Sequence, residues 1–185
     1  MTLHADIWST LDGWRPERPE QESLRHAFLG FVAAREDSCA RSCAAGHITA
    51  SALVLDSTGS QALLTLHPRV GRWIQLGGHC EPEDMTLAGA ALREAREESG
   101  MDDLTIDEKP LHLDVHPIIC SLGVPTRHFD VRFLIRAPAG ALPVRSDEST
   151  DLRWWPVDGL PSDVDTVARQ VELALERVRS LATRG

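Results

Sequence analysis

One stretch, Gly77 to Met101, constrains this chain more than any other, and it reads GGHCEPEDMTLAGAALREAREESGM. Two glycines open it, and its second half predicts a helix over Thr86–Ser99. Glu94, Glu97 and Glu98 stand at i, i+3 and i+4, so a helix places all three carboxylates on one side. Like charges at this spacing repel each other, and we therefore expect a divalent cation among them.

The chemistry of this stretch suits Mg²⁺ or Mn²⁺, which prefer oxygen ligands and often bind substrate phosphates as well. The Gly77-Gly78 turn lets the backbone come close, so a main-chain carbonyl is a candidate ligand. Arg93, four residues before Glu97, is placed to fix the orientation of a carboxylate. The alternative is an exposed helix face with ion pairs through Arg93 and Arg96. The flanking glycines and the preceding strand favour the metal site.

The rest of the chain predicts a mixed β-sheet with helices before, within and after it, which indicates an α/β or α+β fold. Strands are predicted at 48–55, 62–66, 73–76, 111–119, 129–135 and 152–157, and helices at 19–36, 86–99 and from Ser162 onward. We divide the chain into an N-terminal helical extension (1–45) and a main domain (46–185). We expect the extension to pack on the main domain or on a second subunit, which makes a homodimer a candidate assembly.

Composition excludes several partner classes. The formal net charge of −9 disfavours nucleic-acid polymers and anionic membranes, but a bound cation can reverse the local field for a small phosphorylated substrate. The N-terminus has no basic segment followed by an apolar run, and no apolar stretch approaches membrane-spanning length. Four cysteines are too few for a disulfide framework, so we expect a cytoplasmic protein with reduced thiols.

The central stretch resembles the Nudix box of the Nudix hydrolases. REAREESGM, from Arg93 to Met101, matches the second half of the box in full, and Gly78 matches its first glycine. The first glutamate of the box falls on Asp84, and the gap from Asp84 to Arg93 is one residue longer than usual. The late segment 154–160, WWPVDGL, is also similar to the family. The resemblance implies a Nudix-like α/β/α sandwich with a mixed β-sheet.

The resemblance also implies an activity, a metal-dependent pyrophosphohydrolase. Water would attack phosphorus in a nucleoside diphosphate linked to another group, such as a nucleotide or a sugar. It implies Glu97 and Glu98 as metal ligands, Glu94 as a ligand or general base, and the Gly78 carbonyl as a further ligand. Arg93 would hold the glutamates in place, and Glu148 is a candidate acid or base near the metal. The implied cofactor is Mg²⁺ or Mn²⁺. The alternatives on the same fold are a non-catalytic nucleotide-binding regulator and an isoprenoid diphosphate isomerase.

Residues near the box are candidates to bind the substrate. Arg69 and Arg72 precede the box, where a cation suits a phosphate, and Trp73 can stack on a base or lie in the core. His79 and Cys80 follow the glycines and are candidates to contact substrate phosphates or a softer metal. The alternative for these two is a loop histidine and a half-buried thiol.

Two further groups carry hypotheses. His128 and Asp130 alternate with apolar residues, so they can share one strand face and line a pocket, or form an exposed strand end. Cys39, Cys43 and His47 share a spacing of four, which would suit zinc if a fourth ligand such as His4 or Cys80 were near. The alternative is that the cysteines are small buried apolar residues.

Overall fold

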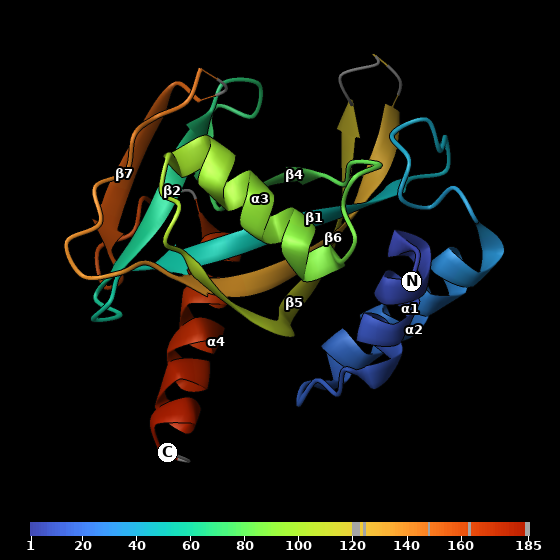
Figure 1. Cartoon of the computed structure of the whole chain (residues 1–185), viewed down its shortest axis with the longest axis horizontal. Coiled ribbons are helices and arrows are strands. Elements are labelled where there is room, and N and C mark those ends of the chain that lie inside the picture. Colours follow the sequence, from blue (N-terminus) through green and yellow to red (C-terminus); the bar gives the residue numbers. More distant parts are fainter. Residues whose placement is uncertain (120–122, 124, 148, 163, 184–185) are drawn as a thin grey trace.

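Helices cover both faces of one mixed β-sheet in the computed structural model, which describes residues 1–185 except 120–122, 124, 148, 163 and 184–185 (Figure 1). In chain order the elements are α1 (Leu3–Gly13), α2 (Pro19–Ala34), β1 (His47–Leu55), β2 (Gln61–His67), β3 (Arg72–Ile74), β4 (Leu76–His79), α3 (Leu87–Ser99), β5 (Thr105–Ile119), β6 (Pro125–Arg136), β7 (Asp151–Pro156) and α4 (Asp165–Ala182). None of the helices in this described part is long and apolar enough to cross a membrane.

Strand β1 is the centre of the sheet. It pairs in parallel with β6 over its whole length, from His47 opposite His128 to Leu55 opposite Arg136. Its other edge is shared, because β4 pairs with its first part and β2 with its last two residues. Strands β3 and β7 pair with β2, and β5 pairs with β6. Only the β1–β6 pair is parallel among the pairs described, so the prediction of a mixed sheet is confirmed.

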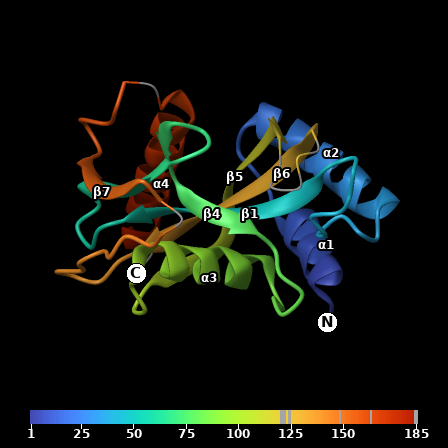
Figure 2. The same cartoon turned by 90° about the horizontal axis from the view of Figure 1, so that it is seen from above.

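Two apolar clusters lie on opposite faces of this sheet. Alternate residues of β1 point to each face, with Ile48, Ala50, Ala52 and Val54 in one cluster and Leu53 and Leu55 in the other. The first cluster packs against α3 through small residues such as Ala91 and Ala95. The second packs against α4, whose Val167 and Ala174 are fully buried. Figure 2 shows the sheet between α3 and α4, and the predicted α/β/α sandwich is confirmed.

The N-terminal helices α1 and α2 form a pair beside the sheet, at the opposite end from β7 in both views (Figures 1 and 2). The helix predicted at 19–36 corresponds closely to α2, whereas α1 is not among the helices that the sequence predicts. Ile7, Leu11, Phe28 and Val32 are fully buried in the same cluster that contains α3. The extension therefore packs on the main domain.

Candidate active site

Helix α3 packs on the sheet with one buried face, and Glu94 and Glu98 lie on that same face as Ala91 and Ala95. Thr86 begins the helix by accepting a hydrogen bond from the Gly89 N–H, and Gly100 ends it in the left-handed conformation at φ +64°. Ala91 and Ala95 are fully buried against the sheet. Their small side chains let α3 lie close to β4, so the acidic side chains reach the glycines of that strand.

Two of the three predicted glutamates, Glu94 and Glu98, are buried at β4. They are 9% and 6% exposed, and they stand one helical turn apart. A Cβ atom added at Gly78 would lie 2.7 Å from both carboxylate oxygens of Glu94. The Gly77 N–H donates a hydrogen bond of 2.9 Å to Glu98 Oε2. Gly77 and Gly78 lie in strand β4 and not in the predicted turn, and together with these two carboxylates they form one site.

The third glutamate, Glu97, turns away from the other two. Its side chain is 58% exposed, and its Oε2 accepts a hydrogen bond of 3.0 Å from Arg93 Nη1. Among the described residues, no three carboxylates place oxygens within 4.8 Å of one another. The site thus offers two buried carboxylates and one at its rim.

Arg93 joins the helix to the loop that precedes it. Its Nε and Nη2 donate to the two oxygens of Asp84 at 3.1 and 2.9 Å, and Nη2 also donates to the His79 carbonyl. Its Nη1 donates to both Glu94 and Glu97. The hydrogen bond with Asp84 is the main reason that the pKa of Arg93 is raised. Burial raises the pKa of Asp84, but hydrogen bonds from Arg93 and the Glu81 backbone outweigh it and lower that pKa overall.

The loop between β4 and α3 accommodates its extra residue without losing this pairing. The Glu81 N–H donates to Asp84 Oδ2 at 2.8 Å, and the Asp84 N–H donates to the Glu81 carbonyl at 3.1 Å. These bonds close a tight turn that directs Asp84 toward Arg93. Asp84, the shorter acid at the position of the first glutamate of the box, therefore pairs with this arginine.

Gly77 is required by the backbone itself. Its φ of +143° is rare for residues with a side chain, and an added Cβ would lie 2.4 Å from the Ser51 Cα in β1. Glycine at this position lets β4 pair closely with β1, which positions Gly78 against Glu94.

The predicted substrate residues before the box lie apart from the carboxylates. Arg69 and Arg72 are exposed, in the β2–β3 turn and on β3. Trp73 is half-buried and packs edge-on against Trp155 at 5.2 Å between ring centroids. The Arg153 guanidinium lies 5.7 Å from the centre of the Trp73 ring. Trp73 therefore packs with the second apolar cluster.

His79 and His128 lie on the sheet face opposite Glu94, and the structure brings them together. Their ring centroids are 5.1 Å apart, and the His47 ring lies 5.0 Å from His79 and 4.9 Å from His128. Burial, followed by the charges of neighbouring groups, lowers the pKa of His79 to about 3 and that of His128 to about 4. Both rings are therefore neutral at pH 7.

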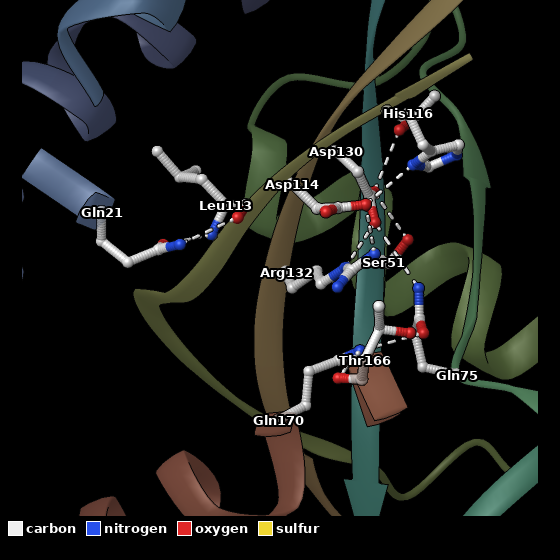
Figure 3. A network of polar contacts seen from close by, with 11 residues as sticks. Gln21, Ser51, Gln75, Leu113, Asp114, His116, Asp130, Arg132, Thr166 and Gln170 are labelled. Atoms are coloured by element: carbon white, nitrogen blue, oxygen red, sulfur yellow. Dashed lines mark hydrogen bonds and ion pairs between the residues drawn. The ribbon is translucent and has the colours of Figure 1, made fainter. Parts of the chain in front are cut away.

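Asp130 shares the face of His128, as the alternation predicts, but its carboxylate is enclosed in a buried network (Figure 3). Its oxygens accept hydrogen bonds from Thr49 and Ser51 on β1, and from Arg132 Nε at 2.7 Å. Arg132 Nη2 reaches onward to Asp114 on β5 at 2.9 Å. No local pattern in the sequence indicates Arg132 or Asp114, because their pairing depends on the register of β5 with β6.

The cysteines do not gather with His47. Cys43 is buried and Cys39 is half-buried, and within the described residues the one cluster of three metal-ligating side chains is His47, His79 and His128. Burial is the main cause that raises the pKa of Cys80, which favours its thiol form. Glu148, the further acid that the family resemblance implies, lies outside the described residues.

Comparisons with known proteins identify the family and the fold of this chain. The family model of the NUDIX domain matches residues 46–174. An Ap4A hydrolase from C. elegans has a similar structure, with 21% identity, a TM-score of 0.51, and coverage of 74% of this chain and 98% of that chain. A NUDIX-family hydrolase from Clostridium perfringens has 19% identity, a TM-score of 0.51, and coverage of 69% of this chain and 97% of its own.

A third similar structure is a MutT NUDIX hydrolase from Burkholderia pseudomallei, at 21% identity and a TM-score of 0.50, covering 69% of this chain and 97% of that chain. No curated protein sequence matches this chain significantly. At these identities the solved structures establish the fold, and the NUDIX match covers most of the sequence.

Proposed function

This chain belongs to the Nudix family of hydrolases, and from that premise we propose that it cleaves a nucleoside diphosphate linked to another group. The observation that carries the proposal is the pair of buried carboxylates, Glu94 and Glu98, placed against Gly77-Gly78. The proposed reaction is attack of water on phosphorus, which breaks the phosphoanhydride bond. Dinucleotides, nucleotide sugars and nucleoside triphosphates form the substrate class.

The charges around Arg93 support a divalent cation at this site. Arg93 contacts Asp84, Glu94 and Glu97, and its Nε lies 4.0 Å from a carboxylate oxygen of Glu81, so its one positive charge is shared among several carboxylates. Buried carboxylates are costly unless a cation compensates them. Glu94, Glu98 and Glu97, together with the Gly78 carbonyl, would hold Mg²⁺ or Mn²⁺. When bound, such an ion neutralises phosphate charge and lowers the pKa of a bound water.

The protein residues have separate tasks in this proposal. Arg93 holds Glu94 and Glu97 in position, since a guanidinium binds several carboxylates in fixed directions. Glu94 or Glu98 would accept the proton of the attacking water, and both are buried where such a carboxylate is shielded from bulk solvent. Glu148 remains a candidate for the same task.

Substrate contacts are proposed from residues on both sides of the box. Arg69 and Arg72 are exposed cations suited to phosphate, and Trp73 and His79 are half-buried. His128 and Asp130 are retained as candidates from the opposite face of the sheet. Asp130 would act through its partners there, because its carboxylate is surrounded by hydrogen-bond donors.

The experiment replaces each buried carboxylate by its neutral isostere. We expect Glu94→Gln and Glu98→Gln to lower kcat by about 100-fold or more on the best substrate of a Mg²⁺ and Mn²⁺ panel. The panel contains dinucleoside polyphosphates, nucleoside triphosphates and ADP-sugars. Glu108→Gln is the matched control, because Glu108 is exposed on β5, away from this site.

Three results would contradict the proposal. One is full turnover in both glutamine variants, and another is full turnover in a chelator without added metal. The third is binding of a nucleotide with no turnover of any panel substrate, which would favour the non-catalytic regulator. Folding of each variant is checked by its urea unfolding curve.

A further inference from the structure

Three histidines from three adjacent strands meet on the sheet face that lies opposite α3. His47 begins β1 and is directly opposite His128 in the register with β6, and His79 ends β4 opposite Thr49. Their ring centroids are 4.9–5.1 Å apart in all three pairings. One nitrogen from each ring lies within 4.8 Å of one nitrogen of each of the other two. The sheet itself therefore gathers the three imidazoles.

His47 is the member of this cluster that needs an explanation. It is 0% exposed, and among the described residues neither of its ring nitrogens has a partner in hydrogen-bond geometry. The backbone at Cys43 is close enough to raise its pKa, but burial is the larger effect and lowers it overall. His128 Nε2 is likewise buried without a hydrogen-bond partner. A buried polar atom without a hydrogen-bond partner destabilises the folded protein, so this imidazole is a candidate ligand.

The protonation of the rings suits ligation. Only a neutral imidazole offers a lone pair to a metal ion, and burial lowers the pKa of His128 to about 4. The Arg41 cation contributes to lowering the pKa values of all three histidines. The same positive charge opposes a metal ion bound here, and an anionic ligand on the metal would offset that repulsion.

We propose that His47, His79 and His128 bind one divalent transition-metal ion of the zinc class, with one coordination position left open to water or an oxygen anion. Imidazole ligands suit Zn²⁺, Co²⁺, Ni²⁺ and Cu²⁺, whereas Mg²⁺ prefers oxygen ligands. Three protein ligands with an open fourth position are typical of zinc sites that bind a further molecule.

This site is separate from the acidic site on α3. Gly78 faces Glu94 on one side of β4, and the next residue, His79, projects its ring to the other side. The two sites also differ in ligand chemistry, carboxylates on one face and imidazoles on the other. The proposal therefore stands or fails independently of hydrolysis at the box.

The geometry requires a small adjustment of the side chains. Tetrahedral zinc with Zn–N bonds of about 2.0–2.1 Å needs nitrogens about 3.3 Å apart. The nitrogens are within 4.8 Å of one another now, and rotation of the half-buried His79 and His128 rings can bring them closer. His47 is fixed by its burial at the start of β1 and would serve as the rigid ligand.

The test uses the full chain without an affinity tag, stripped of metal by a chelator and titrated with Co²⁺ and then Zn²⁺. We expect about one Co²⁺ per chain, with the visible absorption of four-coordinate cobalt, and displacement of that absorption by Zn²⁺ but not by Mg²⁺. His79→Gln and His128→Gln should weaken Co²⁺ binding by about 100-fold or more.

Two controls isolate the cluster. The first control, His112→Gln, removes a half-buried histidine on the same sheet face. Among the described residues its Nδ1 also has no hydrogen-bond partner. This variant should bind Co²⁺ as the parent protein does. A double variant with Glu94→Gln and Glu98→Gln should also keep the cobalt site, because these residues lie on the other face. Both controls leave the three imidazoles in place.

Specific results would overturn the inference. A stoichiometry below about 0.1 Co²⁺ or Zn²⁺ ion per chain in the titration would do so, because a site with three imidazole ligands should be filled. Cobalt binding in His128→Gln equal to that of the parent would also overturn it, as would loss of the site in the double glutamate variant. His47→Gln is not used, because a fully buried position confounds binding with folding.

Discussion

At the scale of single residues, Arg93 and Asp84 show how an atypical sequence keeps the geometry of its site. The sequence predicts the positions of Glu94, Glu97 and Glu98 on α3, because helical spacing fixes them. It did not predict that Glu97 turns outward to Arg93, or that the shorter Asp84 reaches the same arginine. The position of Asp84 depends on the turn at Glu81, which no helical or strand periodicity in the sequence indicates.

The Asp84–Arg93 pair leads to a prediction about pH. The pKa of Asp84 is lowered in the folded protein, so its stabilising effect is present above its unfolded pKa near 4 and is lost as pH falls below that value. We expect Asp84→Asn to lower the free energy of unfolding by about 1–3 kcal/mol at pH 7. Urea unfolding from pH 7 to pH 3 should show the difference from the parent shrinking below about pH 4.

A matched control separates the pair from general charge effects. Asp103 is exposed, so the free energy of unfolding of Asp103→Asn should lie within about 0.5 kcal/mol of that of the parent at neutral pH. A stability difference for Asp84→Asn that persists unchanged at pH 3 would contradict the prediction.

At the scale of elements, one face of strands β1 and β6 changes from polar to apolar residues along the length of the strands. Their first parts carry His47, Thr49 and Ser51 beside His128, Asp130 and Arg132, and their last parts carry Leu53 and Leu55 beside Leu134. Alternation in the sequence predicts that His128 and Asp130 share a face. It does not reveal that partners about 80 residues away fill the space around Asp130, because they come from the parallel pairing of β1 with β6.

The limited reach of local sequence patterns also explains two differences between the predicted and the observed elements. Strand β5 begins at Thr105, before the predicted Leu111, and its pairing with β6 shifts register between Asp107 and His112. Pro110 lies inside that shift, and a proline argues against a strand when read locally. Helix α1 is short and mixes polar with apolar residues, so its periodicity is weak.

The buried Asp130–Arg132 ion pair predicts that the substitution of Asp130 by its neutral isostere strongly lowers the stability of the protein. Asp130 and Arg132 are both buried, so neutralising Asp130 leaves the arginine with Asp114 as its remaining carboxylate. We expect Asp130→Asn to lower the free energy of unfolding by about 2–4 kcal/mol in urea at pH 7. Asp151→Asn breaks a comparable pair with the exposed Arg153 and should cost less than about 1 kcal/mol. Equal effects of the two substitutions would contradict this assignment.

At the scale of the whole molecule, the N-terminal extension and the family domain share one core. The NUDIX match begins at residue 46, yet Phe28 and Val32 are fully buried with the residues that support α3. Gln21 extends the contact, since its amide donates to the Leu113 carbonyl and accepts from the Leu113 N–H. Asp6 accepts a hydrogen bond from the Leu87 N–H at the start of α3. A homodimer through this extension stays a prediction.

This shared core predicts that residues 1–45 cannot be removed without loss of the fold. We expect a chain of residues 46–185 to aggregate, or to unfold at low urea, because the apolar surface under α1 and α2 becomes exposed. In the full chain, Phe28→Ala should lower the free energy of unfolding by about 3–5 kcal/mol. Trp8 is 40% exposed, and Trp8→Ala should change stability far less. A monomeric 46–185 fragment with the stability of the full chain would contradict the prediction.

The register of strand β4 is constrained by contacts on both faces of the sheet. Its residues alternate between the faces of the sheet, so Gly78 lies against the carboxylate of Glu94 while His79 lies beside His47. A slip of one residue in either direction would turn the imidazole of His79 to the sheet face of Glu94 and turn Gly78 to the sheet face of His47. Insertions and deletions in this strand would therefore damage both surfaces of the protein at once, whereas the loop after it tolerates an added residue.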